Sequence, residues 1–427
     1  MTCQVVLLNA WGIGLASDSA VTSGNRVSNG SEKIFALPEP HKLAILTSSR
    51  AKVMGFPWES ILSAWSESLT KPLASIEEYW LSLEKWLCSS ITSTTTVTEA
   101  EFSYLEDVIY WKLWNDLYDN VWHPVLYPHY SRVLKPEDIA YIDEGTIWDP
   151  EFKAKQSKAL SKELLKQCIE IIQQLENRRM TNHDPAKGIN SGQSRVWLDR
   201  YFSLYPNRFN KTFYEELLSN FPTVPGLEER LTSLAVTYLT NPDWSSTMLC
   251  LVGFGAEDLL PSALEVEILG FVGGVRLGGA FSTMTSVSSS GHLFYGQRDA
   301  LDSLVLGRDS ILMDATAKQN EAISKFRSQL QENDDAALTE LREAFESTLA
   351  QANIENEVIS VGREQRLRPF QKAVQMSPVR DLAEFASTLV GVQSARAAFS
   401  QDNPTVGGPI DVATITRHEG FRWLRKK

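Results

Sequence analysis

A threonine directly follows the initiator methionine, and this position could make it a nucleophile. If Met1 is removed, Thr2 carries a hydroxyl group and a free α-amine on one residue. That amine has an unperturbed pKa of about 7.7–8.0, so a substantial share is neutral base at physiological pH. Threonine paired with its own N-terminal amine is a recognised way to activate a weak nucleophile. The small side chain favours removal of Met1 by ordinary methionine aminopeptidase. A threonine at position 2 that has no catalytic role would, however, look the same in the sequence.

Three segments near the two ends of the chain decide between these interpretations. They read LASDSAVTSG over 15–24, EKIFAL over 32–37 and GGPIDVATITRHEGF over 407–421. The first two resemble the opening strands of proteasome β subunits, and the third resembles the strand that closes such a subunit. The chain therefore resembles the proteasome-β-like N-terminal-nucleophile (Ntn) threonine hydrolases. Within that family it resembles the bacterial proteasome-type homologues.

The resemblance assigns roles to two charged residues. Lys33 matches the family lysine beside the nucleophile, where a positive charge favours the alkoxide and keeps the nearby amine deprotonated. Asp18 matches the aspartate that holds this lysine by a charge-assisted hydrogen bond. Singly, Asp18 is also typical of a turn and Lys33 of an exposed strand end, but their joint spacing favours catalysis. Lys33 stands one residue closer to the nucleophile than in most relatives, which implies a small deletion within 25–31.

Three further positions match the family site less closely. Thr47 falls where the family has a glycine whose backbone N–H stabilises the oxyanion, and its side chain is expected to narrow the site. Ser289, with Ser290 one residue away, best matches a serine that hydrogen-bonds near the threonine amine. Thr405, in the segment 402–405, stands near the family's terminal Asp and Ser, in a form closer to the bacterial Anbu-type homologues. It is equally typical of a turn.

Hydropathy patterns predict the elements that would position these residues. Alternation and turn residues predict strands over 5–8, 15–17, 33–37, 42–46, 247–255, 264–271 and 410–416. Helical spacing predicts one helix from a Ser48 or Ser49 cap through Trp65. Further helices are expected over 76–90, from 288–291 through 306, and over 379–399.

The family-like pattern is interrupted twice. The segment 93–243 reads as helical and aromatic, with a loop over 177–194, and 314–377 reads as a helical hairpin. Without these insertions, 2–92, 244–313 and 378–427 together match the size of one proteasome β subunit. The resemblance then implies an α+β fold, a four-layer αββα Ntn-hydrolase sandwich of two antiparallel sheets. The segment 93–243 would form a helical cap on it.

Composition narrows the partners and the location. The chain has 427 residues, a formal net charge of −12 and a pI near 5.2, and its short basic C-terminal tail reads as a solvated end. Nucleic acid is therefore not an expected partner. No apolar run approaches the roughly 18–20 residues that span a bilayer, and no secretory signal is evident, so no membrane association is expected. Four scattered cysteines without a C-x-x-C pair predict free thiols and a cytoplasmic location.

No cofactor or metal is expected. His123 and His129 flank a loop, but no helical histidine pair or carboxylate spacing accompanies them. The glycines within 270–279 are not followed by the Lys-Ser/Thr pair of a P-loop.

The leading hypothesis is a proteasome-like threonine peptidase that hydrolyses peptides or unfolded proteins through an acyl-enzyme on Thr2. The resemblance implies a homo-oligomeric ring, and energy for unfolding would have to come from a separate ATPase. Two alternatives stay open. One is a standalone amidohydrolase whose insertions close a pocket over a small amide. The other is an inactive structural homologue, which a retained Met1 or a crowding Thr47 would favour.

Overall fold

A computed structural model gives the fold of this chain. It describes residues 2–23, 26–28, 32–92, 98–105, 111–133, 162–182, 191–204, 227–240, 246–279, 282–285, 291–307, 361–400 and 406–427, with a few single positions between 318 and 325.

The N-terminal hairpin lies at the centre of a five-stranded antiparallel sheet with the order β14-β1-β2-β15-β16. Its strands are β1 (Cys3–Asn9), β2 (Gly12–Asp18), β14 (Gly291–Gly296), β15 (Ile410–Thr416) and β16 (Gly420–Arg425). Strands from the far C-terminal part of the chain thus flank the hairpin. Ile410 pairs with Asp18, which places the beginning of β15 beside the end of β2.

A second five-stranded antiparallel sheet has the order β13-β10-β9-β6-β5. Its strands are β5 (Ile34–Ala36), β6 (Lys42–Ser48), β9 (Thr247–Phe254), β10 (Ser262–Ile268) and β13 (Ser282–Thr285). The short strand β5 forms one edge of this sheet, and Lys33 directly precedes it.

The two sheets pack face to face through a shared core. Within β1, Val6 and Leu8 belong to this inter-sheet cluster, whereas Val5 and Leu7 belong to the cluster on the opposite face. Strand β6 divides in the same way. Because successive side chains of a strand point to opposite faces, an apolar run such as Val5–Leu8 is what a strand buried on both faces requires.

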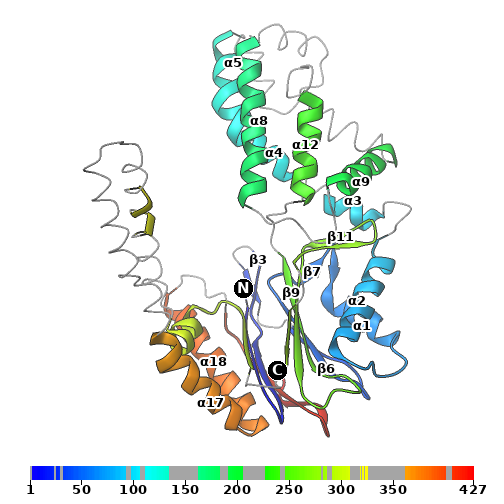
Figure 1. Cartoon of the computed structure of the whole chain (residues 1–427), viewed down its shortest axis with the longest axis vertical. Coiled ribbons are helices and arrows are strands. Elements are labelled where there is room, and N and C mark those ends of the chain that lie inside the picture. The colour runs from blue at the N-terminus through cyan, green and yellow to red at the C-terminus, as the bar shows by residue number, and fades with distance from the viewer. Residues whose placement is uncertain are drawn as a thin grey trace, which may run out of the picture.

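Helices cover the outer face of each sheet, as Figure 1 shows. Helices α1 (Trp58–Glu67) and α2 (Ile76–Ser90) pack on the second sheet, and α17 (Arg368–Met376) and α18 (Val379–Ser400) pack on the first. Ser75 caps α2 by accepting a hydrogen bond from the Glu78 amide. Gly14 lets α18 lie close, because a Cβ there would stand 2.3 Å from the Ala383 nitrogen.

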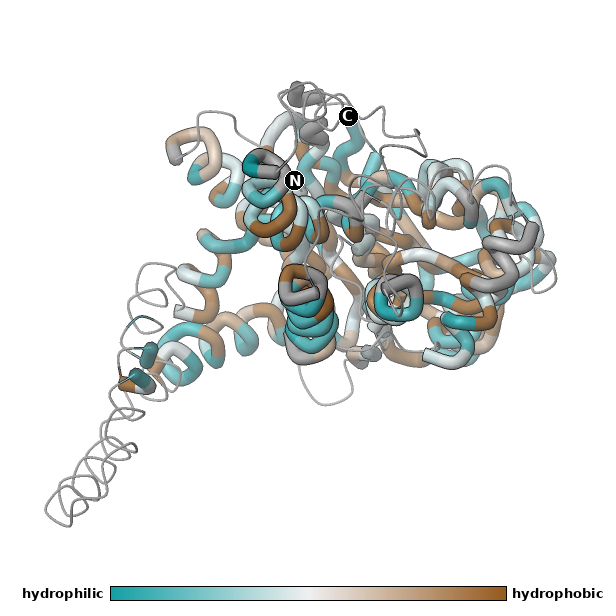
Figure 2. The backbone as a smooth tube through the Cα atoms, turned by 90° about the horizontal axis from the view of Figure 1, so that it is seen from above, coloured by the Kyte–Doolittle hydropathy of each residue, from teal (hydrophilic) through white to brown (hydrophobic). Residues whose placement is uncertain are grey.

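Apolar stripes explain which face of each of these helices is buried. The side chains of α18 that face the sheet recur at helical spacing and include Leu382, Ala386 and Leu389, all buried. Brown and teal segments accordingly alternate along the helical tubes in Figure 2.

A group of helices extends beyond one end of the two sheets (Figure 1). It comprises α3 (Glu99–Leu105), α4 (Trp111–Leu117), η2 (Tyr118–Leu126), α5 (Tyr127–Val133), α8 (Lys162–Asn182), α9 (Ser191–Leu204) and α12 (Leu227–Thr240). Arg179 of α8 is buried over the ring of Tyr238 in α12, 3.5 Å from its centroid, which joins these two helices. Tyr104 of α3 donates a hydrogen bond of 2.9 Å to the Leu269 carbonyl, which attaches the group to the sandwich.

Short elements complete the described chain. Three hairpins pair β3 (Val21–Ser23) with β4 (Arg26–Ser28), β7 (Lys52–Val53) with β8 (Phe56–Pro57), and β11 (Gly270–Val272) with β12 (Val275–Leu277). The remaining helical turns are α13 (Asp299–Leu301), η4 (Asp302–Leu306) and η5 (Arg363–Leu367).

The α+β class predicted from the sequence is confirmed. The helix over 76–90 and the strand over 410–416 have the predicted bounds, and the predicted final helix corresponds to α18. Most of the predicted hairpin over 314–377 lies outside the described residues, and the part from 361 onward is helical.

Three predictions are wrong in part. The segment after Ser49 forms the β7–β8 hairpin, so α1 begins only at Trp58, after the cap Pro57. The predicted helix from 288–291 through 306 contains strand β14, whose burial on both faces gives it a helix-like apolar run, and is helical only from Asp299 onward. Helix α8 continues through Asn182 and α9 begins at Ser191, which shortens the predicted loop over 177–194. The basic residues of the C-terminal tail are exposed, as expected of a solvated end, although Gly420–Arg425 form the edge strand β16.

Candidate active site

Asp18 and Lys33 form a buried ion pair where the two sheets meet. The Lys33 ammonium donates a hydrogen bond of 2.7 Å to Asp18 Oδ1, and the side chains are 4% and 0% exposed. The ammonium also donates to the Ala20 carbonyl at 2.6 Å. Asp18 ends β2 of the first sheet, whereas Lys33 precedes β5 of the second. The predicted pairing of these two residues is therefore present.

The Asp18 carboxylate also fixes the backbone that carries Thr2. Oδ1 accepts the Cys3 amide at 2.8 Å, on the same oxygen that binds Lys33. Oδ2 accepts the amides of Ala20 and Gly407 at 3.3 and 3.1 Å. Because the Lys33 ammonium and the Thr2–Cys3 peptide share one oxygen, the positive charge lies next to the residue predicted to be the nucleophile.

Burial has a marked effect on the lysine. Loss of solvent lowers the pKa of Lys33 from its usual value, and the adjacent Asp18 carboxylate raises it part of the way back. The lysine is therefore a weaker base than a surface lysine, and the Asp18 carboxylate favours its charged form.

Thr2 is held from its other side by the end of β14. Its carbonyl accepts the Gln297 amide at 2.7 Å, and the residue is 7% exposed. Gly296 makes this approach possible, since a Cβ there would stand 1.7 Å from the Thr2 oxygen and its φ of 77° suits glycine. Sequence reasoning missed Gly296, although a glycine at a strand end is a signal for such a close approach.

Gln4 is a second residue that sequence reasoning missed. Its side chain is fully buried, and Nε2 donates to the carbonyls of Lys33 at 3.3 Å and Thr47 at 3.0 Å. Gln4 lies on β1, so its side-chain amide links the first sheet to the edge of the second sheet beside Lys33. An uncharged polar side chain inside an apolar strand was the available signal.

Cys3, beside Thr2, does not compete as a nucleophile. Its thiol is buried, and burial together with the charge on Asp18 raises its pKa well above the usual value. Because the thiolate is the reactive form, this cysteine stays inert near neutral pH.

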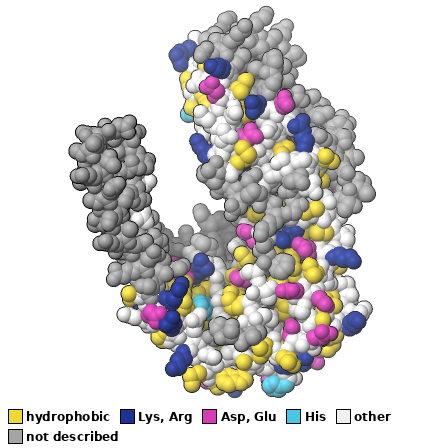
Figure 3. Space-filling model, viewed as in Figure 1, with side chains coloured by type: hydrophobic (Ala, Val, Ile, Leu, Met, Phe, Trp, Pro, Cys, Tyr) yellow, Lys and Arg dark blue, Asp and Glu magenta, His cyan; other side chains and the backbone are white. Residues whose placement is uncertain are grey.

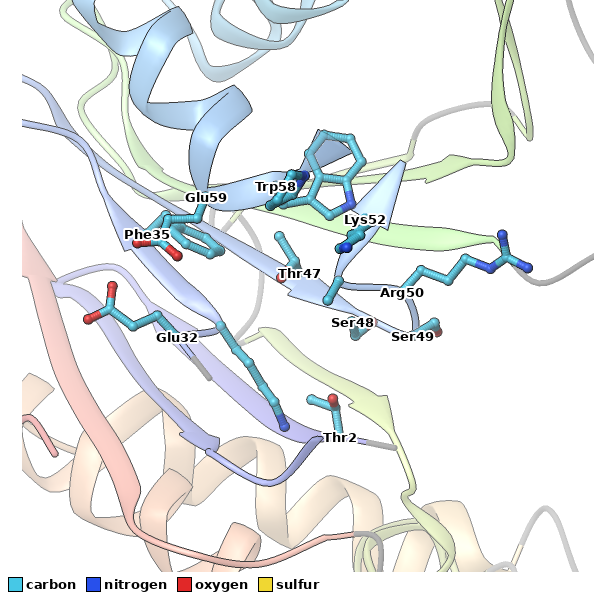
Figure 4. A pocket seen from close by; sticks show the side chains of 13 residues that line it. Thr2, Glu32, Phe35, Thr47, Ser48, Ser49, Arg50, Lys52, Trp58 and Glu59 are labelled. Atoms are coloured by element: carbon cyan, nitrogen blue, oxygen red, sulfur yellow. The ribbon is translucent and has the colours of Figure 1, made fainter. Parts of the chain in front are cut away.

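A cavity of about 250 Å³ opens in front of Thr2, and Lys33 also lines it. Figure 4 shows Thr2 across from Thr47 and Ser48, while Arg50 directs its guanidinium away from Thr2. The remaining lining residues come from the β6–α1 connection, the start of α1 and the flanks of β5. The space in front of the threonine hydroxyl is therefore large enough for a small acyl group and its leaving group.

The assignment of Thr47 as the oxyanion donor needs correction. Its side chain lines the cavity, but its amide already donates a hydrogen bond of 3.1 Å to the Lys33 carbonyl as part of the β5–β6 ladder. Two residues later, Ser49 has a φ of 75°, a left-handed conformation that favours glycine. Among the described residues, the Ser49 amide has no hydrogen-bond partner. Ser49 therefore offers an uncommitted backbone amide beside the cavity, which Thr47 does not.

Ser289 and Thr405 lie outside the described residues, as does Met1. Gly407 donates to Asp18, so the chain shortly after Thr405 reaches the site. Gly291, two residues after Ser289, instead pairs with Leu8, at the end of β1 that lies away from Thr2, and this gives no support to the assignment of Ser289.

Within the part of the chain that the structure describes, no group of histidine, cysteine or acidic side chains could hold a metal ion. In the same part, no helix is long and apolar enough to cross a membrane. On the face drawn in Figure 3, basic and acidic side chains of the described residues are interspersed.

Comparisons with known proteins give little further guidance. No protein-family model matches the chain, and no curated protein matches it. Among solved structures, it is similar to Anbu (ancestral beta-subunit) from Yersinia bercovieri, with 8% sequence identity and a TM-score of 0.30. That alignment covers 100% of this chain and 88% of the other. At this level the likeness assigns neither family nor activity, so the site must be interpreted from its own chemistry.

Proposed function

We propose that this protein is an Ntn threonine hydrolase that cleaves amide bonds through an acyl-enzyme on Thr2, after removal of Met1. The observation that carries the proposal is the shared oxygen of Asp18, which binds both the Lys33 ammonium and the Cys3 amide. A buried cation beside a threonine, in front of an open cavity, has the geometry of an activated nucleophile. The two packed sheets with outer helices support the four-layer αββα sandwich of the Ntn hydrolases.

In the first half-reaction, the Thr2 hydroxyl oxygen attacks the substrate carbonyl carbon and forms a C–O bond. The hydroxyl proton passes to the α-amine of Thr2, directly or through water, and then to the nitrogen of the leaving amine. The C–N bond breaks, and the acyl group remains on Thr2 as an ester. The Lys33 ammonium stabilises the alkoxide that develops on the threonine.

The second half-reaction uses a water molecule in place of the hydroxyl. The α-amine takes one proton from water while the water oxygen attacks the ester carbon. The ester C–O bond then breaks, the proton returns to the threonine oxygen, and the acid product leaves. Water is the only co-reactant that this sequence of steps consumes.

The tetrahedral intermediates of both steps carry a negative oxygen that needs a donor. We assign this role to the Ser49 amide, since the Thr47 amide is committed to Lys33. Removing one oxyanion donor typically costs about 10²–10³ in rate, so this assignment matters for turnover.

The domain partition follows as part of the proposal. The core would comprise 2–92, 244–313 and 378–427, with 93–243 as the helical cap. Helix α17 packs against the first sheet through Val374 and Phe370, so we place it with the core and end the second insertion near 361. Assembly into a homo-oligomeric ring and service by a separate ATPase remain proposals of the same kind.

Intact mass and N-terminal sequencing test the first requirement, because the purified protein should begin at Thr2. A threonine-directed electrophile such as an epoxyketone should then label the wild type and not Thr2→Ala. Thr2→Ser, which keeps a hydroxyl on the same amine, is the matched control and should still be labelled. Quantitative retention of Met1, or equal labelling of Thr2→Ala, would leave only an inert structural homologue.

A further inference from the structure

A second hollow of about 350 Å³ adjoins the cavity in front of Thr2. The two share three lining residues, Glu32, Phe35 and Glu59, so they lie side by side. We call the second hollow the edge groove, because it follows the edge of the second sheet at β5. The Thr2 cavity alone is smaller than the roughly 300–1,000 Å³ of typical ligand sites, so a ligand that also enters the edge groove gains most of its contact there.

One face of α1 forms a wall of the edge groove. Glu59, Leu62, Ser63 and Ser66 line it at helical spacing. The two serines are small, so space remains between this helix and the strands opposite. Leu62 is buried and offers an apolar surface at the base of the wall.

Strand β16 forms the opposite wall. Trp423 lines the groove, and its ring packs edge-on against Phe421 with centroids 4.9 Å apart. Lys426 lies over the Trp423 ring and forms an ion pair of 2.9 Å with Glu32. Since Glu32 is neutralised in this way, the groove offers mainly aromatic and aliphatic contacts.

The floor of the groove is the edge of the second sheet, where β5 pairs only with β6 among the described strands. Lys33 and Leu37 exchange backbone hydrogen bonds with β6, through Thr47 N–Lys33 O at 3.1 Å and Leu37 N–Leu43 O at 3.0 Å. Backbone groups alternate in direction along a strand, so those of Ile34 and Ala36 point away from β6. Both residues line the edge groove, and Ala36 is exposed. Such an edge is a template for pairing with another extended chain.

We propose that the edge groove binds an extended polypeptide segment of the substrate, which pairs with β5 and places an apolar side chain among Phe35, Leu62 and Trp423. This inference rests on the proposed function and deepens it, because it makes the substrate a peptide or unfolded chain rather than a small amide. The shared lining residues favour a segment of the substrate itself as the occupant, since one extended chain can reach both adjacent hollows.

The test is to fill the groove without touching the nucleophile. Ser63→Trp places a large ring in the groove from an exposed helix position, and Ser60→Trp places the same ring on an exposed position of α1 that does not line it. Each variant is assayed with fluorogenic peptides of about three and about eight residues that share one scissile bond, since each residue of an extended chain spans about 3.3–3.6 Å. Labelling of Thr2 by a small epoxyketone is measured in parallel.

The wild type should cleave the longer peptide about tenfold faster in kcat/KM than the shorter one. Ser63→Trp should abolish this preference by raising KM for the longer peptide, while Ser60→Trp retains it. Normal Thr2 labelling with no effect of length, or an unchanged length preference in Ser63→Trp, overturns the edge-groove inference alone. Failure of Thr2 labelling in the wild type overturns the proposed function instead, so the two failures are distinguishable.

Discussion

The buried ion pair between Asp18 and Lys33 predicts that neutralising Asp18 and neutralising Lys33 lower the free energy of unfolding by different amounts. In Asp18→Asn, the Lys33 ammonium stays buried with the Ala20 carbonyl as its remaining full acceptor. The new amide nitrogen must also face the N–H groups of Ala20 and Gly407, which donate to the carboxylate in the native protein. Removing one partner of a buried pair costs about 3–5 kcal/mol, and these opposed donors place Asp18→Asn at the upper end.

Lys33→Met is expected to cost less. The Asp18 carboxylate then keeps three backbone donors, from Cys3, Ala20 and Gly407, and Met fills much of the space of the lysine stem. Losing one hydrogen-bonding partner of a buried group costs about 1–3 kcal/mol. The double variant Asp18→Asn/Lys33→Met should be more stable than Asp18→Asn alone, because the uncompensated ammonium is gone.

Urea unfolding followed by tryptophan fluorescence measures these differences. With a slope of about 3 kcal/mol per molar urea, the Asp18→Asn midpoint should fall by about 1 M or more. None of the three variants should be labelled by an epoxyketone at the wild-type rate. Equal losses of stability in the two single variants, or a double variant less stable than Asp18→Asn, would refute this reasoning about how each charge depends on the other.

Three further predictions concern the same site. Gly296→Ala puts a methyl group against the Thr2 carbonyl and should slow epoxyketone labelling by about 10²-fold, since a displacement near 1 Å can slow a reaction by this factor. Gly55→Ala is the control, because Gly55 has a similar positive φ but no atom close to its added methyl group. It should be labelled normally. Gln4→Leu should lower the free energy of unfolding by about 1–3 kcal/mol and also slow labelling, and a loss of stability with unchanged labelling would show that Gln4 only holds the fold. The lowered pKa of Lys33 means that the unfolded state binds more protons between that pKa and about 10.4, so this residue makes stability rise with pH across that window. Wild type should therefore gain stability relative to Lys33→Met as the pH rises toward about 10.4, and a gap that stays constant on this alkaline side would contradict the lowered pKa.

Much of the central fold could be predicted because its signals are local. Val5–Leu8 and the turn at Gly12 define the first hairpin, and the capped apolar stripe of α2 defines that helix. The errors arise where burial removes periodicity or where a turn interrupts a pattern. Strand β14 is buried on both faces, so its apolar run does not differ from that of a buried helix, and the positive φ of Met54 and Gly55 marks a hairpin where the apolar spacing predicts a helix.

The site could be predicted only in part, for a different reason. Thr2, Asp18 and Lys33 carry recognisable residue types at family-like spacing, and the structure brings them together. Which backbone amide faces the cavity depends on strand register and on φ, which residue types do not encode. Position along the chain therefore favours Thr47, whereas the ladder commits the Thr47 amide to Lys33 and leaves the Ser49 amide as the donor that we propose. Gln4 and Gly296 carry only weak local signals, a polar residue in an apolar strand and a glycine at a strand end, and these signals do not identify the distant backbone that each residue contacts.

The arrangement around Asp18 explains why the site depends on the whole sandwich. Its carboxylate binds the N-terminal backbone at Cys3, the end of its own hairpin at Ala20, the edge of the other sheet at Lys33, and the segment that leads into β15 at Gly407. These segments are far apart in the sequence, so a partly folded chain would leave part of the buried charge uncompensated at a cost in free energy. The full set of contacts therefore forms when the two sheets have packed and the segment before β15 has reached Asp18. Reactivity at Thr2 is in this way coupled to completion of the fold, and a chain lacking β15 and β16 should show no labelling of Thr2 even where Met1 has been removed.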